Sequence, residues 1–193
     1  MKTATIAILT LCLVAAPHAA GDGWRAGQGD VRVLCPLTVG GSFEARTTAL
    51  TGALAAGPPG SSALSGQLSV DLRTLDSGIE LRNDHLRNKY LEAGKGEGFD
   101  TAVLSDIVLG KADAGTVQGK TTFTGTLLLH GTKKPVSGEA EIRRSPSSVR
   151  VSASFPITLA DYGIAKPQYL GIGVRNQVRV KVTFVAAPAG AGA

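Results

Sequence analysis

Apolar and polar residues alternate along most of this chain, and this alternation is the feature that most constrains its fold. In a β-strand, successive side chains point to opposite faces, so a period of two indicates a strand with one buried face. Between Val149 and Leu159 every odd position is apolar, whereas the even positions are mostly polar. The same alternation occurs over residues 31–39, 68–73, 117–129, 136–143 and 174–184. The sequence therefore predicts half-buried strands in these segments.

Two further strands, at residues 43–54 and 101–109, bring the expected total to about eight. Turn sequences such as Gly40-Gly41, Pro58-Pro59-Gly60 and Gly131 separate them. The connections are short, which favours antiparallel pairing in a closed barrel or a sandwich. An eight-stranded barrel either fills its interior with side chains or holds one small ligand.

Residues 78–92 interrupt the alternation. The apolar residues of this segment are widely spaced among charged ones: Ile79, Leu86, Tyr90 and Leu91. Such spacing fits a short amphipathic helix. Ser77 is the expected cap because Glu80 follows it by three residues, and Gly94 is expected to end the helix. The predicted fold class is therefore all-β with one short helical insert.

The first 20 residues have the pattern of a secretory signal peptide. Lys2 precedes an apolar run that begins at Ile6, and the small residues Ala19 and Ala20 follow it. The run is shorter than the roughly 20 residues that span a bilayer. We therefore expect a signal peptide at 1–20, one domain at 21–187 and a flexible tail at 188–193, with the mature protein periplasmic or secreted.

The charge balance limits the choice of partner. The whole chain has 20 Lys plus Arg and 15 Asp plus Glu, and removal of Lys2 with the signal leaves 19 against 15. The basic residues are scattered rather than clustered with stacking aromatic rings, which argues against nucleic-acid binding. Weak attraction to an anionic membrane surface is compatible with this balance, and a homodimer is left open.

No catalytic or metal-binding motif is recognisable. His85 and His130 are the two histidines beyond the signal, and they lack the spacing of a zinc site. Cys35 is the one cysteine there, so it cannot form an internal disulfide and is expected to be a small buried hydrophobic residue. The acidic residues of the insert region are interpreted as structural: Asp71, Asp76, Glu80 and Asp84. We predict no catalytic residue, metal or cofactor.

Several segments together resemble the YceI-like family of exported, lipocalin-like polyisoprenoid-binding proteins. Residues 69–92 read SVDLRTLDSGIELRNDHLRNKYLE, residues 125–131 read GTLLLHG, residues 160–164 read ADYGI and residues 178–184 form the closing strand VRVKVTF. The resemblance implies an eight-stranded antiparallel barrel whose interior takes an isoprenoid chain, with the insert near one mouth. Residues 97–100 depart from the family, which often has a proline and an aromatic residue there.

The resemblance also suggests a ligand site. Asp84, His85 and Leu86 match the family's acidic, histidine and apolar triplet, and His85 either donates to a carbonyl at the barrel rim or holds the polar end of a ligand. The strand phase predicts the inward-facing wall: Val31, Val33, Leu68, Val70, Phe123, Leu127, Leu129, Phe155, Ile157 and Val180. The predicted function is that of an exported carrier for a long-chain lipid. The alternatives are an envelope interaction module with a solid core and an enzyme that uses His85 or Asp84.

Overall fold

The computed structural model describes residues 23–111, 113–169 and 172–190. The predicted signal peptide and the last three residues of the predicted tail lie outside these ranges. Within them, no helix has the length and apolar character needed to cross a membrane.

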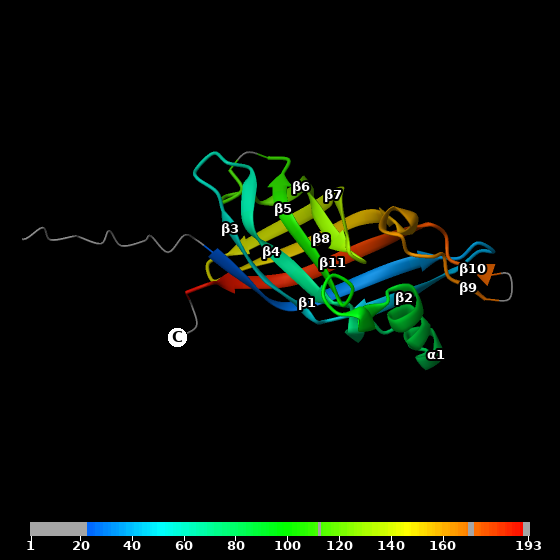
Figure 1. Ribbon diagram of the computed structural model, residues 1–193. Coiled ribbons are helices and arrows are strands. Elements are labelled where there is room, and N and C mark those ends of the chain that lie inside the picture. Colours follow the sequence, from blue (N-terminus) through cyan, green and yellow to red (C-terminus); the bar gives the residue numbers. More distant parts are fainter. Residues whose placement is uncertain (1–22, 112, 170–171, 191–193) are drawn as a thin grey trace, which may run out of the picture.

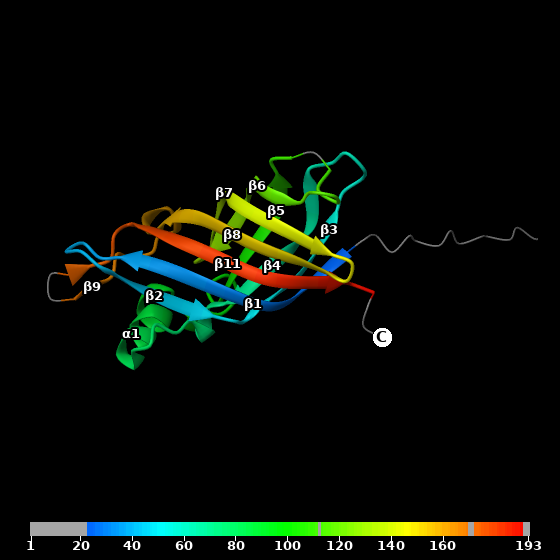
Figure 2. The ribbon, with the colours of Figure 1, turned by 180° about the vertical axis from the view of Figure 1, so that it is seen from behind.

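The chain forms an all-antiparallel barrel (Figures 1 and 2). Its strands are β1 (Gly23–Pro36), β2 (Ser42–Thr47), β3 (Leu50–Ala56), β4 (Ala63–Asp71), β5 (Thr101–Leu109), β6 (Gly119–Leu129), β7 (Thr132–Ser145), β8 (Ser148–Thr158) and β11 (Gln177–Pro188). The first part of β1 pairs with β3 and its last part with β2, so β2 and β3 together occupy one position in the wall. Pairing of β1 with β11 closes the sheet, for example at Val31 and Val182. The predicted eight-stranded barrel is confirmed.

Alternating burial shows why these segments form strands. In β6, Thr121, Phe123, Leu127 and Leu129 are buried, whereas Thr122 and Thr124 between them are exposed. The wall strands therefore place one face inside the barrel and the other in water, as the period of two predicts.

The barrel has two structurally different ends (Figure 1). We call one the insert end. It carries the β1–β2 turn, residues 72–100, the helical turn η4 (Leu159–Tyr162) and a short hairpin of β9 (Gln168–Tyr169) and β10 (Ile172–Gly173). The opposite end carries the β3–β4 and β7–β8 turns and the last strand residue, Pro188, which pairs with Trp24. Pro188 thus belongs to the sheet rather than to the predicted tail.

The helical insert differs in detail from the prediction. It consists of α1 (Glu80–Asp84), a π-helical turn η2 (His85–Tyr90) and a 3₁₀ turn η3 (Ala93–Lys95). Ile79 is the N-cap and makes no capping side-chain bond, so Ser77 is not the cap. Ser77 instead donates to the Asn83 side chain through its backbone N–H and its hydroxyl. The helix ends at Leu91, before Gly94, because Glu92 takes a left-handed conformation with φ of 50°.

Candidate functional site

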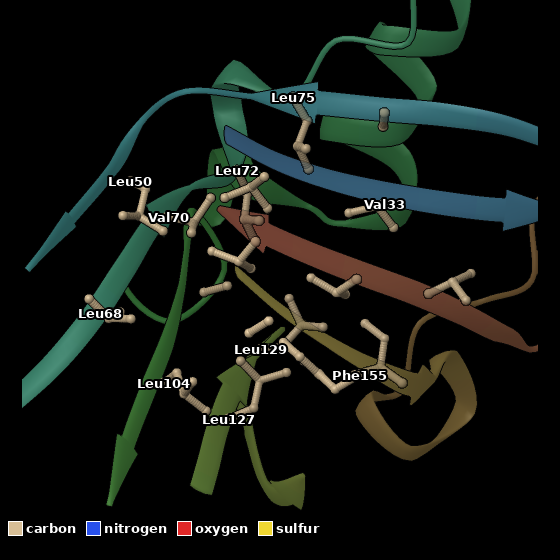
Figure 3. Close-up of a pocket in the computed structure, with 18 of the residues that line it drawn as sticks. Val33, Leu50, Leu68, Val70, Leu72, Leu75, Leu104, Leu127, Leu129 and Phe155 are labelled. Carbon is tan, nitrogen blue, oxygen red and sulfur yellow. The ribbon is translucent and has the colours of Figure 1, made fainter. Parts of the chain in front are cut away.

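The barrel encloses an apolar cavity of ≈ 220 Å³. Residues from every wall strand line it, and none of the lining side chains is charged. Figure 3 shows labelled side chains from several of these strands pointing into the same space, among them Val33, Val70, Leu127 and Phe155. The interpretation of the barrel as a solid core therefore does not agree with the structure.

Small residues on the inner face create this space. Ala140 of β7 and Ala153 of β8 are cross-strand partners, and both line the cavity. Next to them, a Cβ at Gly138 would lie 2.7 Å from Phe155 Cβ and 2.9 Å from Phe123 Cε1. Glycine at this position lets the two aromatic rings pack edge to face, with 5.8 Å between centroids. The rings fill one part of the barrel, while the alanines leave the adjoining part open.

The predicted inward wall agrees with this geometry. All ten residues line the cavity: Val31, Val33, Leu68, Val70, Phe123, Leu127, Leu129, Phe155, Ile157 and Val180. Their contact with a ligand stays a prediction.

The strand phase missed part of the lining on β5. Ala102 and Leu104 face the cavity from even positions, whereas Ile107 and Leu109 face it from odd positions. The phase changes because the β5–β6 register shifts between Ser105 and Val108, and Asp106 has a φ of 52°. This is a β-bulge, which adds one residue to a strand and reverses the facing of those that follow. The only signal in the sequence is the polar pair Ser105-Asp106 inside an apolar run.

Of the predicted triplet on the insert, Leu86 alone lines the cavity. Asp84 is exposed and its Oδ1 accepts a 2.7 Å hydrogen bond from Asn88. Among the hydrogen bonds of the described residues none comes from His85, and the Leu75 carbonyl beside the insert accepts a 2.8 Å bond from Arg87 Nε. Arginine reaches this carbonyl because its longer side chain extends from the turn across to residue 75. Binding of a ligand's polar end by Asp84 or His85 stays a prediction.

Asn83 connects the insert to the preceding loop, and no sequence motif singles it out. Its buried Oδ1 accepts from the Ser77 backbone and hydroxyl at 2.7 and 2.8 Å. Its Nδ2 donates to Asp76 Oδ1 at 2.7 Å. Hydrogen bonds from Gly78 and then Asn83 hold the pKa of Asp76 below its usual range. The amide thus has polar partners on both sides, as a buried polar group requires.

His130 makes the polar network that His85 lacks. Its Nδ1 lies 2.9 Å from the Tyr162 carbonyl oxygen and its Nε2 lies 2.9 Å from Glu92 Oε2. A carbonyl and a carboxylate only accept, so both bonds form when the ring is protonated at both nitrogens. A hydrogen bond from Lys95 is the largest cause that lowers the pKa of Glu92. The network joins the end of the insert to β6 and η4.

We infer that the cavity opens at the insert end. The lining residues Phe43, Leu86, Tyr90 and Pro167 are half-buried there. At the opposite end Arg144 donates to the Val117 and Ala114 carbonyls, each at 3.0 Å, and its guanidinium lies 5.8 Å from the ring centroid of Trp24. A smaller cavity of ≈ 60 Å³ lies beneath it and shares lining residues such as Leu64 and Phe184 with the main cavity.

Cys35 lies in the cavity wall and is buried, as expected from the sequence. Desolvation raises the pKa of its thiol to about 12, with Arg82 as a smaller opposing influence. A thiol in this state packs as an apolar group rather than acting as a nucleophile.

A closed eight-stranded antiparallel barrel with an apolar cavity and a helical insert at its mouth is a lipocalin-like barrel. The chain belongs to the YceI-like family, whose domain model matches residues 30–186. The family resemblance seen in the sequence is thereby confirmed.

Solved structures share this fold at low sequence identity. Burkholderia cenocepacia BcnA is 15% identical with a TM-score of 0.67, covering 82% of this chain and 96% of its own. A polyisoprenoid binding domain from Saccharophagus degradans, implicated in plant cell wall breakdown, is 18% identical with a TM-score of 0.63, covering 86% and 98%. The Campylobacter jejuni YceI protein is 17% identical with a TM-score of 0.51, covering 70% and 80%. The comparison with curated proteins found no match.

Proposed function

We propose that this protein is a carrier that holds one long-chain apolar lipid, of polyisoprenoid type, inside its barrel. The observation that carries this proposal is the ≈ 220 Å³ cavity without a charged lining residue. Such a site offers dispersion contacts and a dry environment but few polar contacts, which suits a hydrocarbon chain. It offers no group positioned for acid–base or nucleophilic chemistry on a bound molecule, so binding rather than catalysis is proposed.

The cavity wall lacks contacts that a bound lipid would supply. An apolar cavity of about 150 Å³ stays dry in a protein core. The apolar side chains around the ≈ 220 Å³ cavity lack partner atoms on the side that faces it. A lipid that restores these contacts would stabilise the folded protein, because a ligand bound only by the native state adds to its stability.

The shape of the site favours a chain over a compact molecule. The main and the smaller cavity share lining residues and follow one another along the strands from the insert end to Arg144. The polyisoprenoid class is supported by family membership and by the similar fold of the Saccharophagus degradans polyisoprenoid binding domain. Export is part of the proposal and rests on the signal pattern of residues 1–20.

Lipid extraction tests the proposal. Protein purified from its own host would be extracted with organic solvent, and the extract analysed by mass spectrometry. We expect about one long-chain lipid per protein, and an intact-mass measurement is expected to show a mature chain that begins at Gly21. A protein that releases no lipid and also takes up no added polyprenol or long-chain quinone would refute the carrier function.

The cavity wall supplies a matched pair of variants. Leu127→Asp places a carboxylate in the cavity, which hydrocarbon cannot solvate, so lipid uptake should be lost. Thr124→Asp, on the exposed face of the same strand, should retain uptake. Circular dichroism would verify that both variants remain folded. Equal uptake by the two variants would place the lipid outside the barrel.

A further inference from the structure

Four large aliphatic side chains are exposed at the insert end. Val39 is 72% exposed, Leu81 62%, Ile79 50% and Ile172 47%. Among the residues that the structure describes, the one other exposed large hydrophobic residue is Val108, which is 39% exposed and lies toward the opposite end. Isolated apolar residues on a surface need no explanation, but a group of four at one end suggests an interaction site. We call these four residues the apolar rim.

The rim residues come from three segments that contact one another. Thr38 and Gly173 exchange two hydrogen bonds, at 2.8 and 3.0 Å, which join the β1–β2 turn to the β9–β10 hairpin. The guanidinium of Arg82 stacks on the ring of Phe43, 4.4 Å from its centroid, and joins α1 to β2. Figure 2 shows β2, β9 and α1 grouped at this end, away from the C-terminus.

Each rim segment also supplies part of the cavity mouth. The segment with Val39 carries Phe43, the segment with Leu81 carries Leu86 and Tyr90, and the segment with Ile172 carries Pro167 and Val174. A hydrocarbon chain that leaves the cavity therefore meets the apolar rim next. If an apolar phase already covered the rim, a lipid that passes this end would expose little of its hydrocarbon chain to water.

These three segments carry more basic than acidic residues, whereas the insert end as a whole, residues 37–41, 72–100 and 159–176, carries seven of each. Residues 37–43, 79–91 and 164–176 contain five basic residues: Arg82, Arg87, Lys89, Lys166 and Arg175. They contain two acidic residues, Glu80 and Asp84, so the net charge of the three segments is 5 − 2 = +3. Exposed aliphatic side chains flanked by basic ones are typical of surfaces that insert into the interface of an anionic bilayer.

We propose that the apolar rim docks on the surface of a bilayer that contains anionic phospholipid, and that lipid passes there between the bilayer and the cavity. This inference rests on the proposed carrier function and names the surface from which the cavity is loaded. The aliphatic side chains insert among the acyl chains, while the exposed Lys89 and Lys166 contact phosphate groups.

Vesicle binding tests the docking surface. The triple variant Val39→Ser, Leu81→Ser, Ile172→Ser removes most of the apolar rim, and Val108→Ser is the matched control because it removes an exposed valine elsewhere. With vesicles of phosphatidylglycerol and phosphatidylcholine, the triple variant should bind at least about tenfold more weakly than the unmodified protein, because it loses three inserted side chains. The control should bind normally. Binding to vesicles of phosphatidylcholine alone should be weaker. Added salt should weaken binding to the phosphatidylglycerol vesicles but not binding to phosphatidylcholine alone.

Lipid transfer separates this inference from the carrier function. Loaded from detergent micelles, the triple variant should take up polyprenol as well as the unmodified protein. Loaded from vesicles, its uptake should be at least about tenfold slower. Absence of vesicle binding by the unmodified protein, or full binding by the triple variant, would overturn the docking proposal while leaving detergent loading intact. Failure of detergent loading in the unmodified protein would instead overturn the carrier function. A dimer in sedimentation analysis that the triple variant abolishes would assign the rim to a second copy and overturn docking.

Discussion

Replacing Ala153 by leucine should stabilise the lipid-free protein and weaken its lipid binding. Ala153 faces the cavity from the middle of β8, between Ala140 and Val182 on the neighbouring strands. Leucine adds three carbon atoms, and at ~0.8 kcal/mol each their burial is worth ~2.4 kcal/mol. Ordering the longer side chain takes back about 0.5–1 kcal/mol, which leaves a net gain of about 1.5–2 kcal/mol.

Thermal and urea unfolding of delipidated protein would measure this gain. One kcal/mol shifts the midpoint of a domain of this size by about 2–4 °C, so the expected rise is about 3–8 °C. The same atoms occupy space that the ligand would use, so affinity for polyprenol should fall about tenfold or more. Ala53→Leu, on the exposed face of β3, is the control and should change neither property appreciably. A variant that is less stable, or that binds lipid with unchanged affinity, would refute the assignment of open space beside residue 153.

Two further predictions concern the thiol in the wall and the buried amide of the insert. Burial raises the pKa of Cys35 from 9.0 to about 12, a difference of 3, so at pH 8 the folded protein should contain about 10³-fold less thiolate than an unshifted thiol would. Alkylation by iodoacetamide should therefore be very slow in the folded protein, accelerate about tenfold per pH unit toward pH 12, and be fast at pH 8 only after denaturation; rapid labelling of folded protein at pH 8 would contradict the burial. Asn83→Ala removes the partner of the Ser77 N–H and should lower the free energy of unfolding by about 1–3 kcal/mol, whereas Asn88→Ala, which loses only an exposed bond to Asp84, should cost little. Equal effects of the two substitutions in urea unfolding would show that Asn83 does not hold the insert.

The lipid-binding proposal and the membrane-docking proposal depend on different parts of the molecule. The first depends on the inner face of the barrel, where uncharged side chains line a hollow. The second depends on three segments at the insert end. Each segment carries an exposed aliphatic residue and also a residue that lines the cavity, such as Phe43, Leu86 or Val174. Loop segments carried by a rigid barrel can vary without loss of the cavity, so the docking surface can be altered while the interior is retained.

The sequence by itself determined the strands and their inward faces, because burial of one face imposes a period of two that is visible in each segment separately. It failed where the decisive contact is between distant residues. Closure of the barrel depends on the pairing of β1 with β11, which are the first and the last strand. The hollow depends on Ala140 and Ala153 meeting across β7 and β8, and the same alternation would describe a filled barrel.

The polar groups at the mouth were likewise decided by tertiary structure. His85 stood out in the sequence because it lies beside Asp84, yet His130 makes the network, since folding brings Glu92 and the Tyr162 carbonyl to its two ring nitrogens. The bulge at Asp106 reverses the strand phase because local register, and not composition, sets which face a residue takes. Periodicity therefore identified the wall of the barrel, whereas contacts between residues far apart in the chain decided its closure, its cavity and its mouth.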